Sequence, residues 1–131
     1  MPQFGKTSIE KLSTCHPDLQ MLFGEVIKHY DCVILDGYRS NEEQQKLFKQ
    51  GKSKLQAGSS KHNQSPSLAA DVAPWPLDWK DKNRFYHFAG KVQGIAQMLN
   101  IKIRWGGDWD SDNDLKDQNF YDLPHFELAN D

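Results

Sequence analysis

The sequence contains no long hydrophobic run and little cysteine. None of its segments approaches the ~20 apolar residues of a membrane-spanning helix, and the N-terminal residues contain no apolar run of signal-peptide length. We therefore expect synthesis in the cytosol and no stable association with a membrane. Only two cysteines are present, Cys15 and Cys32. In a chain without an export signal such residues are usually free thiols, so we expect no disulfide.

An excess of charge of one sign is also missing. The 16 Lys and Arg residues nearly balance the 18 Asp and Glu residues, which gives a formal net charge of -2, and no basic stripe is present. This excludes a protein that binds nucleic acid by bulk electrostatic attraction. With 131 residues, 37% of them hydrophobic and 26% charged, the chain has the composition of one globular domain with its own core. We expect a single domain over residues 1–131 and a monomer.

Hydrophobic periodicity predicts the main helices. Apolar residues recur at helical spacing over residues 16–30 and again over residues 85–99. Ser40 and Glu43 form a capping-box pattern, which predicts a third helix that ends near residue 51. These three segments contain the helices that we expect.

Short apolar segments between the helices predict strands. They cover residues 32–38, 68–73, 101–105 and 125–128. Residues 52–66 have no periodicity and predict a long loop, and an acidic loop follows over residues 108–121. Helices clustered beside short strands indicate the α+β class, with a small antiparallel sheet flanked by helices.

Two histidines differ from the other three. His62 lies near the end of the long loop and His125 at the edge of a predicted strand, each beside an acidic segment. Together with Asp71 they offer the imidazole and carboxylate donors of an open zinc site, in which a fourth position is left for water. No compact His-x-x-x-His motif is present, so the spacing alone also allows ordinary structural histidines. The remaining histidines have no partner motif: His16, His29 and His87.

Four short motifs follow one another along the chain. They are residues 37–40 (Gly-Tyr-Arg-Ser), 60–62 (Ser-Lys-His), 67–71 (Ser-Leu-Ala-Ala-Asp) and 122–127 (Asp-Leu-Pro-His-Phe-Glu). In order and content they resemble the arginine, Ser-x-His, Gly-x-Ala-x-Asp and acidic-x-x-His motifs of the zinc D-alanyl-D-alanine carboxypeptidase and L-alanyl-D-glutamate peptidase family. The resemblance covers nearly the whole chain, and the size is similar to that of single-domain endolysins of tailed bacteriophages.

Three positions depart from the family pattern. Ser67 stands where the family usually has Gly, and the interval from His62 to Asp71 is longer than is common. Asp122 stands where many relatives have Glu. The use of Asp at this position is similar to the phage endopeptidase branch.

The resemblance implies a hedgehog/DD-peptidase-like fold and roles for six of the motif residues. The implied zinc ligands are His62, Asp71 and His125. Asp122 would be the general base, and Arg39 would stabilise the developing oxyanion. Ser60 would support the site or the substrate through hydrogen bonds.

Ordinary structural roles remain open for several of these residues. Asp71 precedes Val-Ala-Pro and could be a turn residue, although the small Ala69 and Ala70 favour a packed strand. Arg39 could form a surface salt bridge. Ser60 could hydrogen-bond only within its loop.

The resemblance also implies a substrate and a place of action. The expected activity is hydrolysis of peptidoglycan stem peptides at the L-alanyl-D-glutamate bond. The alternatives are a D-alanyl-D-alanine carboxypeptidase of the same family and a non-catalytic zinc-dependent module that binds wall peptide. An endolysin of this kind would accumulate in the host cytoplasm and reach bacterial peptidoglycan after the inner membrane is permeabilised.

The acidic loop is a candidate calcium site. Its aspartates are Asp108, Asp110, Asp112, Asp114 and Asp117. Residues 110–114 imitate the first three ligand positions of a calcium loop, but Leu115 and Tyr121 replace the glycine and the glutamate expected later in that motif. Both a regulatory Ca²⁺ and a solvated acidic loop are open interpretations, since crowded carboxylates repel one another without a cation.

Four tryptophans are interpreted as core or cleft-wall residues rather than as a sugar-stacking platform: Trp75, Trp79, Trp105 and Trp109.

Overall fold

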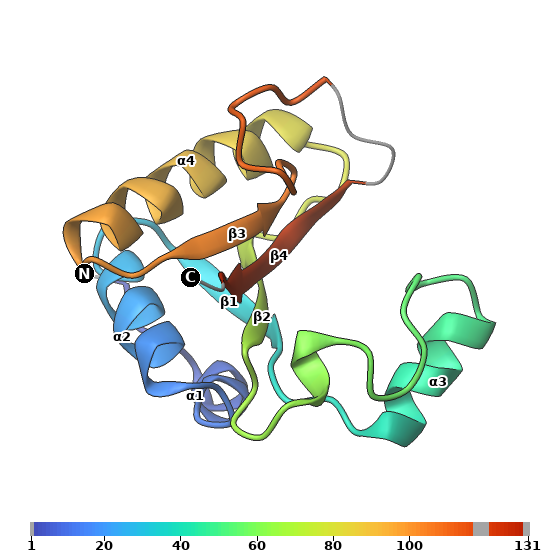
Figure 1. Ribbon diagram of the computed structural model, residues 1–131. Helices are drawn as coiled ribbons and strands as arrows, with labels where there is room; N and C mark the ends of the chain where they lie inside the picture. The colour runs from blue at the N-terminus through green and yellow to red at the C-terminus, as the bar shows by residue number, and fades with distance from the viewer. Residues whose placement is uncertain (1, 117–120, 130–131) are drawn as a thin grey trace.

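A four-stranded sheet organises the chain, as Figure 1 shows for the computed structural model. The structure describes residues 2–116 and 121–129. The strands follow the order β1-β2-β4-β3, and each neighbouring pair is antiparallel. Their bounds are Cys32–Asp36 (β1), Ala69–Pro74 (β2), Ile103–Gly106 (β3) and Asp122–Leu128 (β4). The predicted antiparallel sheet is confirmed.

Four helices are present within the described residues. Their bounds are Lys6–Leu12 (α1), Pro17–Val26 (α2), Asn41–Lys49 (α3) and Lys82–Met98 (α4), and a short 3-10 turn, η1, covers Lys61–Asn63. In Figure 1, α1, α2 and α4 gather on one side of the sheet, whereas α3 stands apart on the other side. The helices therefore flank the sheet, and the predicted α+β class is confirmed. No helix in the described part of the chain is long and apolar enough to span a membrane.

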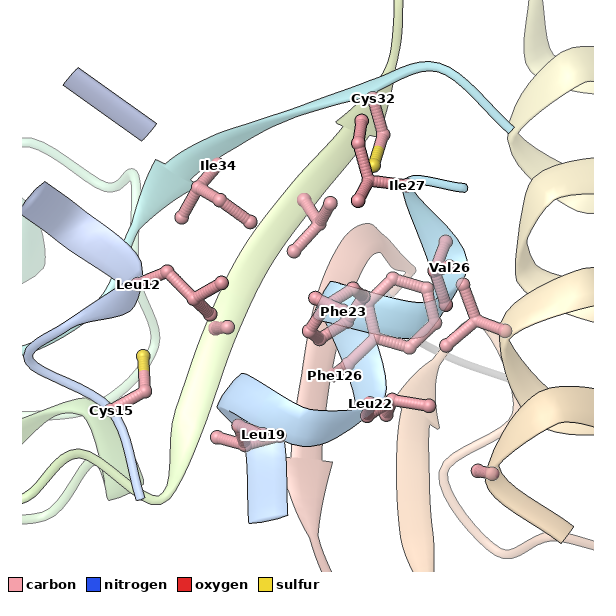
Figure 2. Packing of buried hydrophobic residues seen from close by; sticks show 14 of the residues in the cluster. Leu12, Cys15, Leu19, Leu22, Phe23, Val26, Ile27, Cys32, Ile34 and Phe126 are labelled. Atoms are coloured by element: carbon pink, nitrogen blue, oxygen red, sulfur yellow. The ribbon is translucent and has the colours of Figure 1, made fainter. Parts of the chain in front are cut away.

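Helices α2 and α4 supply much of the core through one apolar face each. Their buried residues are Leu19, Leu22, Phe23 and Val26 on α2 and Phe85, Phe88, Ala89, Val92 and Ala96 on α4. The Phe126 ring on β4 lies 5.6 Å from the Phe23 ring and 6.1 Å from the Phe88 ring, and Figure 2 shows the contact with Phe23. Burial of one such ring contributes roughly 1.5–3 kcal/mol, so Phe126 holds β4 firmly against both helices.

Local signals set the helix starts. The Nδ1 atom of His16 accepts a hydrogen bond from the Asp18 backbone at the start of α2, and Pro17 occupies its first turn. The Ser40 hydroxyl accepts from the Glu43 backbone at the start of α3. The predicted cap at Ser40 is confirmed.

One helix was missed and several element bounds differ from the prediction, among them the end of β1 at Asp36 instead of residue 38 and the start of β3 at Ile103 instead of residue 101. Helix α1 was not predicted, because its seven residues are too few to show a periodic pattern. Helix α2 ends at Val26 instead of residue 30. Strand β4 begins at Asp122 instead of His125, and Pro124 is tolerated there because pairing with β2 starts only at His125 and the ladder to β3 has a bulge at this point.

Candidate functional site

The sheet register brings two of the predicted ligands side by side. Asp71 on β2 and His125 on β4 are paired partners in the antiparallel ladder. The third, His62, comes from η1, which contacts β2. Both histidines are buried. Segments distant in the chain thus meet at one point because β4 inserts between β2 and β3.

The donor atoms of these three residues converge on one point. His62 Nε2 and His125 Nδ1 each lie 3.2 Å from Asp71 Oδ1, and the three donor atoms all lie within 4.8 Å of one another. The two imidazole rings are 5.1 Å apart at 70°. The predicted ligand set is therefore brought together in space.

The outer nitrogen of each ring is already occupied by an acceptor. His62 Nδ1 lies 2.7 Å from the Gly37 carbonyl oxygen, and His125 Nε2 lies 2.8 Å from Glu127 Oε1. A carbonyl or a carboxylate oxygen only accepts, so in a neutral ring the hydrogen resides on the outer nitrogen. The inner nitrogens then present lone pairs toward Asp71, which is the orientation of metal-ligating histidines.

These spacings fit a tetrahedral zinc ion. Ligand atoms about 2.0–2.1 Å from such an ion lie about 3.3 Å from one another. The two nitrogen-to-oxygen separations at Asp71, each 3.2 Å, agree with that value. Two imidazoles and one carboxylate would leave a fourth position for water.

The buried charged groups of the cluster shift one another's pKa values strongly. Burial alone would raise the pKa of Asp71, but the charge of His62 and hydrogen bonds from both histidines hold it well below its usual range. For His125, burial acts to lower the pKa, yet hydrogen bonds to Asp71 and Glu127 raise it to about 9, so without a metal ion Nδ1 also carries a hydrogen, which a bound metal would replace. Perturbed groups of this kind gather at functional sites.

Asp122 lies at the edge of the cluster. Its Oδ2 atom is 3.9 Å from His125 Nδ1, and its side chain is 35% exposed. Burial, followed by the charge of Asp71, raises the pKa of the Asp122 carboxyl. The carboxylate therefore faces both the candidate ligands and solvent.

Arg39 is buried, which contradicts the alternative of a surface salt bridge. Its Nε and Nη2 atoms donate to Asp36 Oδ2 at 3.0 and 2.8 Å, and Nη1 donates to Gln44 Oε1 at 2.7 Å. Nη2 also lies 3.4 Å from Asp71 Oδ2. The guanidinium group is thus held in a fixed orientation beside the cluster.

Ser60 supports the turn that carries His62. Its hydroxyl accepts from the His62 backbone N–H at 3.1 Å, and the Asn63 side chain completes a capping box. Ser60 is buried and also lines the cleft. The hydrogen bond is local to the turn that carries His62, so a contact of Ser60 with substrate stays a prediction.

Three residues that support the site were not found by the sequence analysis: Asp36, Gln44 and Glu127. Glu127 follows His125 by two residues in a strand, a spacing that places both side chains on one face and could have indicated the contact. Gln44 is a fully buried polar residue in α3, whereas Asp36 ends β1. No local pattern reveals these two contacts with Arg39.

A cleft of 760 Å³ opens above the cluster. Six cationic side chains line it, Arg39, Lys52, Lys54, Lys61, Lys82 and Arg104, against three carboxylates, Asp71, Asp122 and Glu127. The cleft is therefore more positive than the chain as a whole, whose formal net charge is -2. Such a cleft attracts an anionic ligand.

The tryptophans divide between core, cleft and surface. Trp105 is buried in the core, and Trp79 and Trp109 line the cleft, as predicted. The Trp109 ring lies 5.4 Å from the His125 ring. Trp75 is 52% exposed and does not line the cleft, so the prediction is wrong for this residue.

Part of the acidic loop forms a second cluster. Asp108, Asp110 and Asp112 each offer a carboxylate oxygen within 4.8 Å of the others. Asp108 is buried, and its Oδ1 atom has no hydrogen-bond partner among the described residues. Burial and the neighbouring Asp110 and Asp112 raise the pKa of Asp108 despite a hydrogen bond from the Asn113 backbone.

The outcome differs for the other two predicted calcium ligands, Asp114 and Asp117. Asp114 is not part of this cluster, and its carboxylate accepts a hydrogen bond from the Lys116 backbone instead. Asp117 lies outside the described residues.

Fold and site together define an α+β enzyme domain with a buried histidine–carboxylate cluster at the floor of a cleft. The profile of the family described as "Phage L-alanyl-D-glutamate peptidase" matches residues 1–129. The chain belongs to this family of peptidases.

Named relatives and a solved structure agree with this assignment. The chain is 31% identical to the L-alanyl-D-glutamate peptidase of Escherichia phage T5, over 97% of this chain and 98% of that protein. It is 32% identical to the peptidoglycan L-alanyl-D-glutamate endopeptidase CwlK of Bacillus subtilis, over 77% of this chain and 62% of that protein. The crystal structure of the Serratia marcescens L-Ala D-Glu endopeptidase ChiX matches with a TM-score of 0.76 at 25% identity, over 97% of this chain and 90% of that chain.

Proposed function

We propose that this protein is a zinc peptidase of the endolysin type that hydrolyses the L-alanyl-D-glutamate bond of peptidoglycan stem peptides. The observation that carries the proposal is the convergence of His62 Nε2, Asp71 Oδ1 and His125 Nδ1 at the cleft floor. The names of the T5, Bacillus and Serratia relatives support the choice of bond. As an endolysin, the enzyme would meet its substrate after leaving the host cytoplasm.

The proposed mechanism assigns zinc to His62, Asp71 and His125. When bound there, zinc would supply a Lewis acid that polarises the scissile carbonyl and lowers the pKa of water. Asp122 takes a proton from the attacking water as a new bond forms to the carbonyl carbon. It then returns that proton to the departing amine nitrogen as the carbon–nitrogen bond breaks.

Arg39 stabilises the negative charge that develops on the carbonyl oxygen in this mechanism. Asp36 and Gln44 hold its guanidinium group in place, so no reorganisation is needed during the reaction. Its burial strengthens the effect, because charges interact more strongly away from water.

The charge of the cleft suits the anionic stem peptides of peptidoglycan. It does not distinguish the two candidate bonds, since a D-alanyl-D-alanine terminus also ends in a carboxylate, so the choice of the L-alanyl-D-glutamate bond rests on the named relatives. Cations outnumber carboxylates along the cleft walls, and such a surface suits a substrate with several negative charges.

Clearing of a peptidoglycan suspension tests this proposal. We expect the wild-type protein to bind one zinc ion and to lower the turbidity, and Asp122→Ala to keep its zinc but lose activity by about 10²–10⁴-fold. Mass spectrometry of the fragments should show new N-terminal D-glutamate. A D-alanine product would instead support the carboxypeptidase alternative.

Two results would contradict the mechanism. Zinc-loaded wild type without hydrolytic activity would favour the non-catalytic binding module. Normal clearing by Asp122→Ala would remove Asp122 from the role of base.

We also propose that Asp108, Asp110 and Asp112 bind Ca²⁺ and thereby regulate the enzyme. The support is the unpartnered, buried Oδ1 atom of Asp108, a residue whose carboxylate clusters with those of Asp110 and Asp112. A cation there would offset the repulsion among these carboxylates. The next residue, Trp109, contacts the His125 ring, so ordering of this loop by Ca²⁺ would change the packing around the proposed zinc ligand His125.

Calcium titration of the zinc-loaded protein tests this second proposal. We expect Ca²⁺ to raise activity and the thermal unfolding temperature, and a chelator that spares zinc to reverse both effects. Asp108→Asn should weaken the response, whereas Asp78→Asn, an exposed aspartate outside the loop, is the matched control. Equal activity and unfolding temperature with and without Ca²⁺ would refute regulation at this loop.

A further inference from the structure

We propose that Glu127 is a positioning residue that sets the orientation and tautomer of His125 and so determines how tightly the site holds its metal. The inference rests on the proposed zinc function. It assigns a role to a carboxylate that takes no part in the reaction steps described above.

Glu127 contacts the far side of the His125 ring. Its Oε1 atom lies 2.8 Å from His125 Nε2, and both side chains are buried. The other ring nitrogen, Nδ1, faces Asp71 Oδ1 at 3.2 Å. The imidazole therefore lies between a carboxylate on its outer side and the candidate metal position on its inner side.

The second oxygen of Glu127 is held by two cations. Oε2 lies 2.8 Å from Arg104 Nη2 and 3.2 Å from Lys61 Nζ. Arg104 belongs to β3 and Lys61 to η1, where it directly precedes His62. One carboxylate thus connects β3, β4 and the turn that carries another candidate ligand.

This arrangement gives Glu127 a defined chemical effect. The two cations offset the cost of burying its charge, which would be large for an unpaired carboxylate. An ionised carboxylate only accepts hydrogen bonds, so it selects the His125 tautomer with hydrogen on Nε2. The lone pair then remains on Nδ1, and rotation of the ring about its own axis is opposed.

The two histidines are oriented by different means. For His62 the acceptor is the Gly37 backbone carbonyl, which side-chain substitution does not remove. For His125 the acceptor is the Glu127 side chain. Substitution of Glu127 therefore tests whether the orientation of His125 matters.

Zinc affinity, measured by competition with a chromophoric chelator, tests the proposal. We expect Glu127→Ala to weaken zinc binding by about 10–100-fold. Glu127→Gln should lose less affinity than Glu127→Ala but still bind zinc more weakly than the wild type, because its amide oxygen accepts from His125 Nε2 without the charge of a carboxylate. The visible spectrum of the Co²⁺-loaded protein should change in Glu127→Ala, since it reports ligand geometry directly.

Glu25→Ala is the matched control. It removes another glutamate–histidine contact, between Glu25 Oε2 and His29 Nε2 at 3.0 Å, on the exposed side of α2. We expect this variant to bind zinc with wild-type affinity. Circular dichroism of each zinc-free variant reports whether it is folded.

The outcomes separate this inference from the proposed function. Wild type that binds no zinc would defeat the proposed function itself. Wild type that binds zinc, together with Glu127→Ala and Glu127→Gln variants of unchanged affinity and Co²⁺ spectrum, would overturn only the role of Glu127. If Glu127→Ala does not fold, the near-isosteric Glu127→Gln decides, and unchanged zinc affinity in that variant overturns the inference.

Discussion

Buried polar side chains around the cleft floor are shared between partners from different elements. Gln44 is fully buried, and it accepts a hydrogen bond from Arg39 while donating to Ser53 Oγ and Leu55 O. Each buried group left without its partner would cost about 1–3 kcal/mol. At the scale of single residues, the site is therefore rigid because its polar groups satisfy one another.

The two cysteines show a different effect of burial. Cys15 and Cys32 are buried free thiols. Burial raises the pKa of Cys15 to about 11 and that of Cys32 to about 12, from a usual value of 9.0. Thiolate is therefore scarce in the folded protein at neutral pH, and both thiols should react slowly with alkylating reagents.

Alkaline pH should destabilise the protein through these thiols. Above pH 9 the unfolded chain loses the thiol protons while the folded chain keeps them, so the stabilisation present below pH 9 is lost as pH rises toward the folded values. We expect the free energy of unfolding to fall by about 1.4 kcal/mol per thiol per pH unit between pH 9 and 11. Urea titrations at pH 9, 10 and 11 measure this slope.

The control is the double variant Cys15→Ala and Cys32→Ala. Other groups titrate equally in both proteins, so the variant should show a shallower decline. Identical slopes in the two proteins would contradict the pKa shifts.

At the scale of elements, the tight packing of β3 against β4 constrains the position of Asp122. Gly106 ends β3, and a Cβ atom placed there would overlap the Asp122 carbonyl oxygen. Asp122 is the residue at which β4 begins. Close packing of the two backbones thus fixes the position of the proposed base.

We expect Gly106→Ala to push the start of β4 away from β3. The overlap is with backbone atoms, so no side-chain rotation relieves it, and overpacking of this kind costs about 1–3 kcal/mol. Activity should fall more than stability, because Asp122 is displaced directly. Clearing assays and thermal unfolding of the same samples measure both quantities.

Gly94→Ala in α4 is the matched control. A Cβ atom there meets nothing within 4 Å, and alanine in a helix interior is more stable than glycine by about 0.5–1 kcal/mol. This variant should be fully active and slightly more stable. Full activity in Gly106→Ala as well would show that the contact does not position Asp122.

The sequence predicts elements whose signal is local and misses those whose cause is a distant contact. Periodicity predicted α4, and the Ser40 and Glu43 pattern predicted the start of α3. The start of β4 was missed because Pro124 is acceptable only within a bulge that depends on β3. Motif resemblance predicted the residues of the site, but the partners of Arg39 could not be predicted without knowing how β1 and α3 meet.

At the scale of the whole molecule, charge is distributed unevenly. The nearly balanced net charge of the chain does not reveal the charge of the cleft, since the cleft cations come from the link between β1 and α3, the segment after α3, the start of α4, β3 and η1. Only folding gathers them around a carboxylate cluster. The anionic substrate that we propose would meet a local charge opposite to that of the molecule.

The pairing of Asp71 with His125 also has a consequence for the order of folding. The two residues are 54 positions apart, and among the described strands β4 comes last along the chain although it occupies an interior position in the sheet. Before β4 is made, β2 and β3 lack their common neighbour and the cluster lacks one of its histidines. A nascent chain without β4 consequently lacks His125 beside Asp71, and the histidine–carboxylate cluster forms only in the step that closes the sheet.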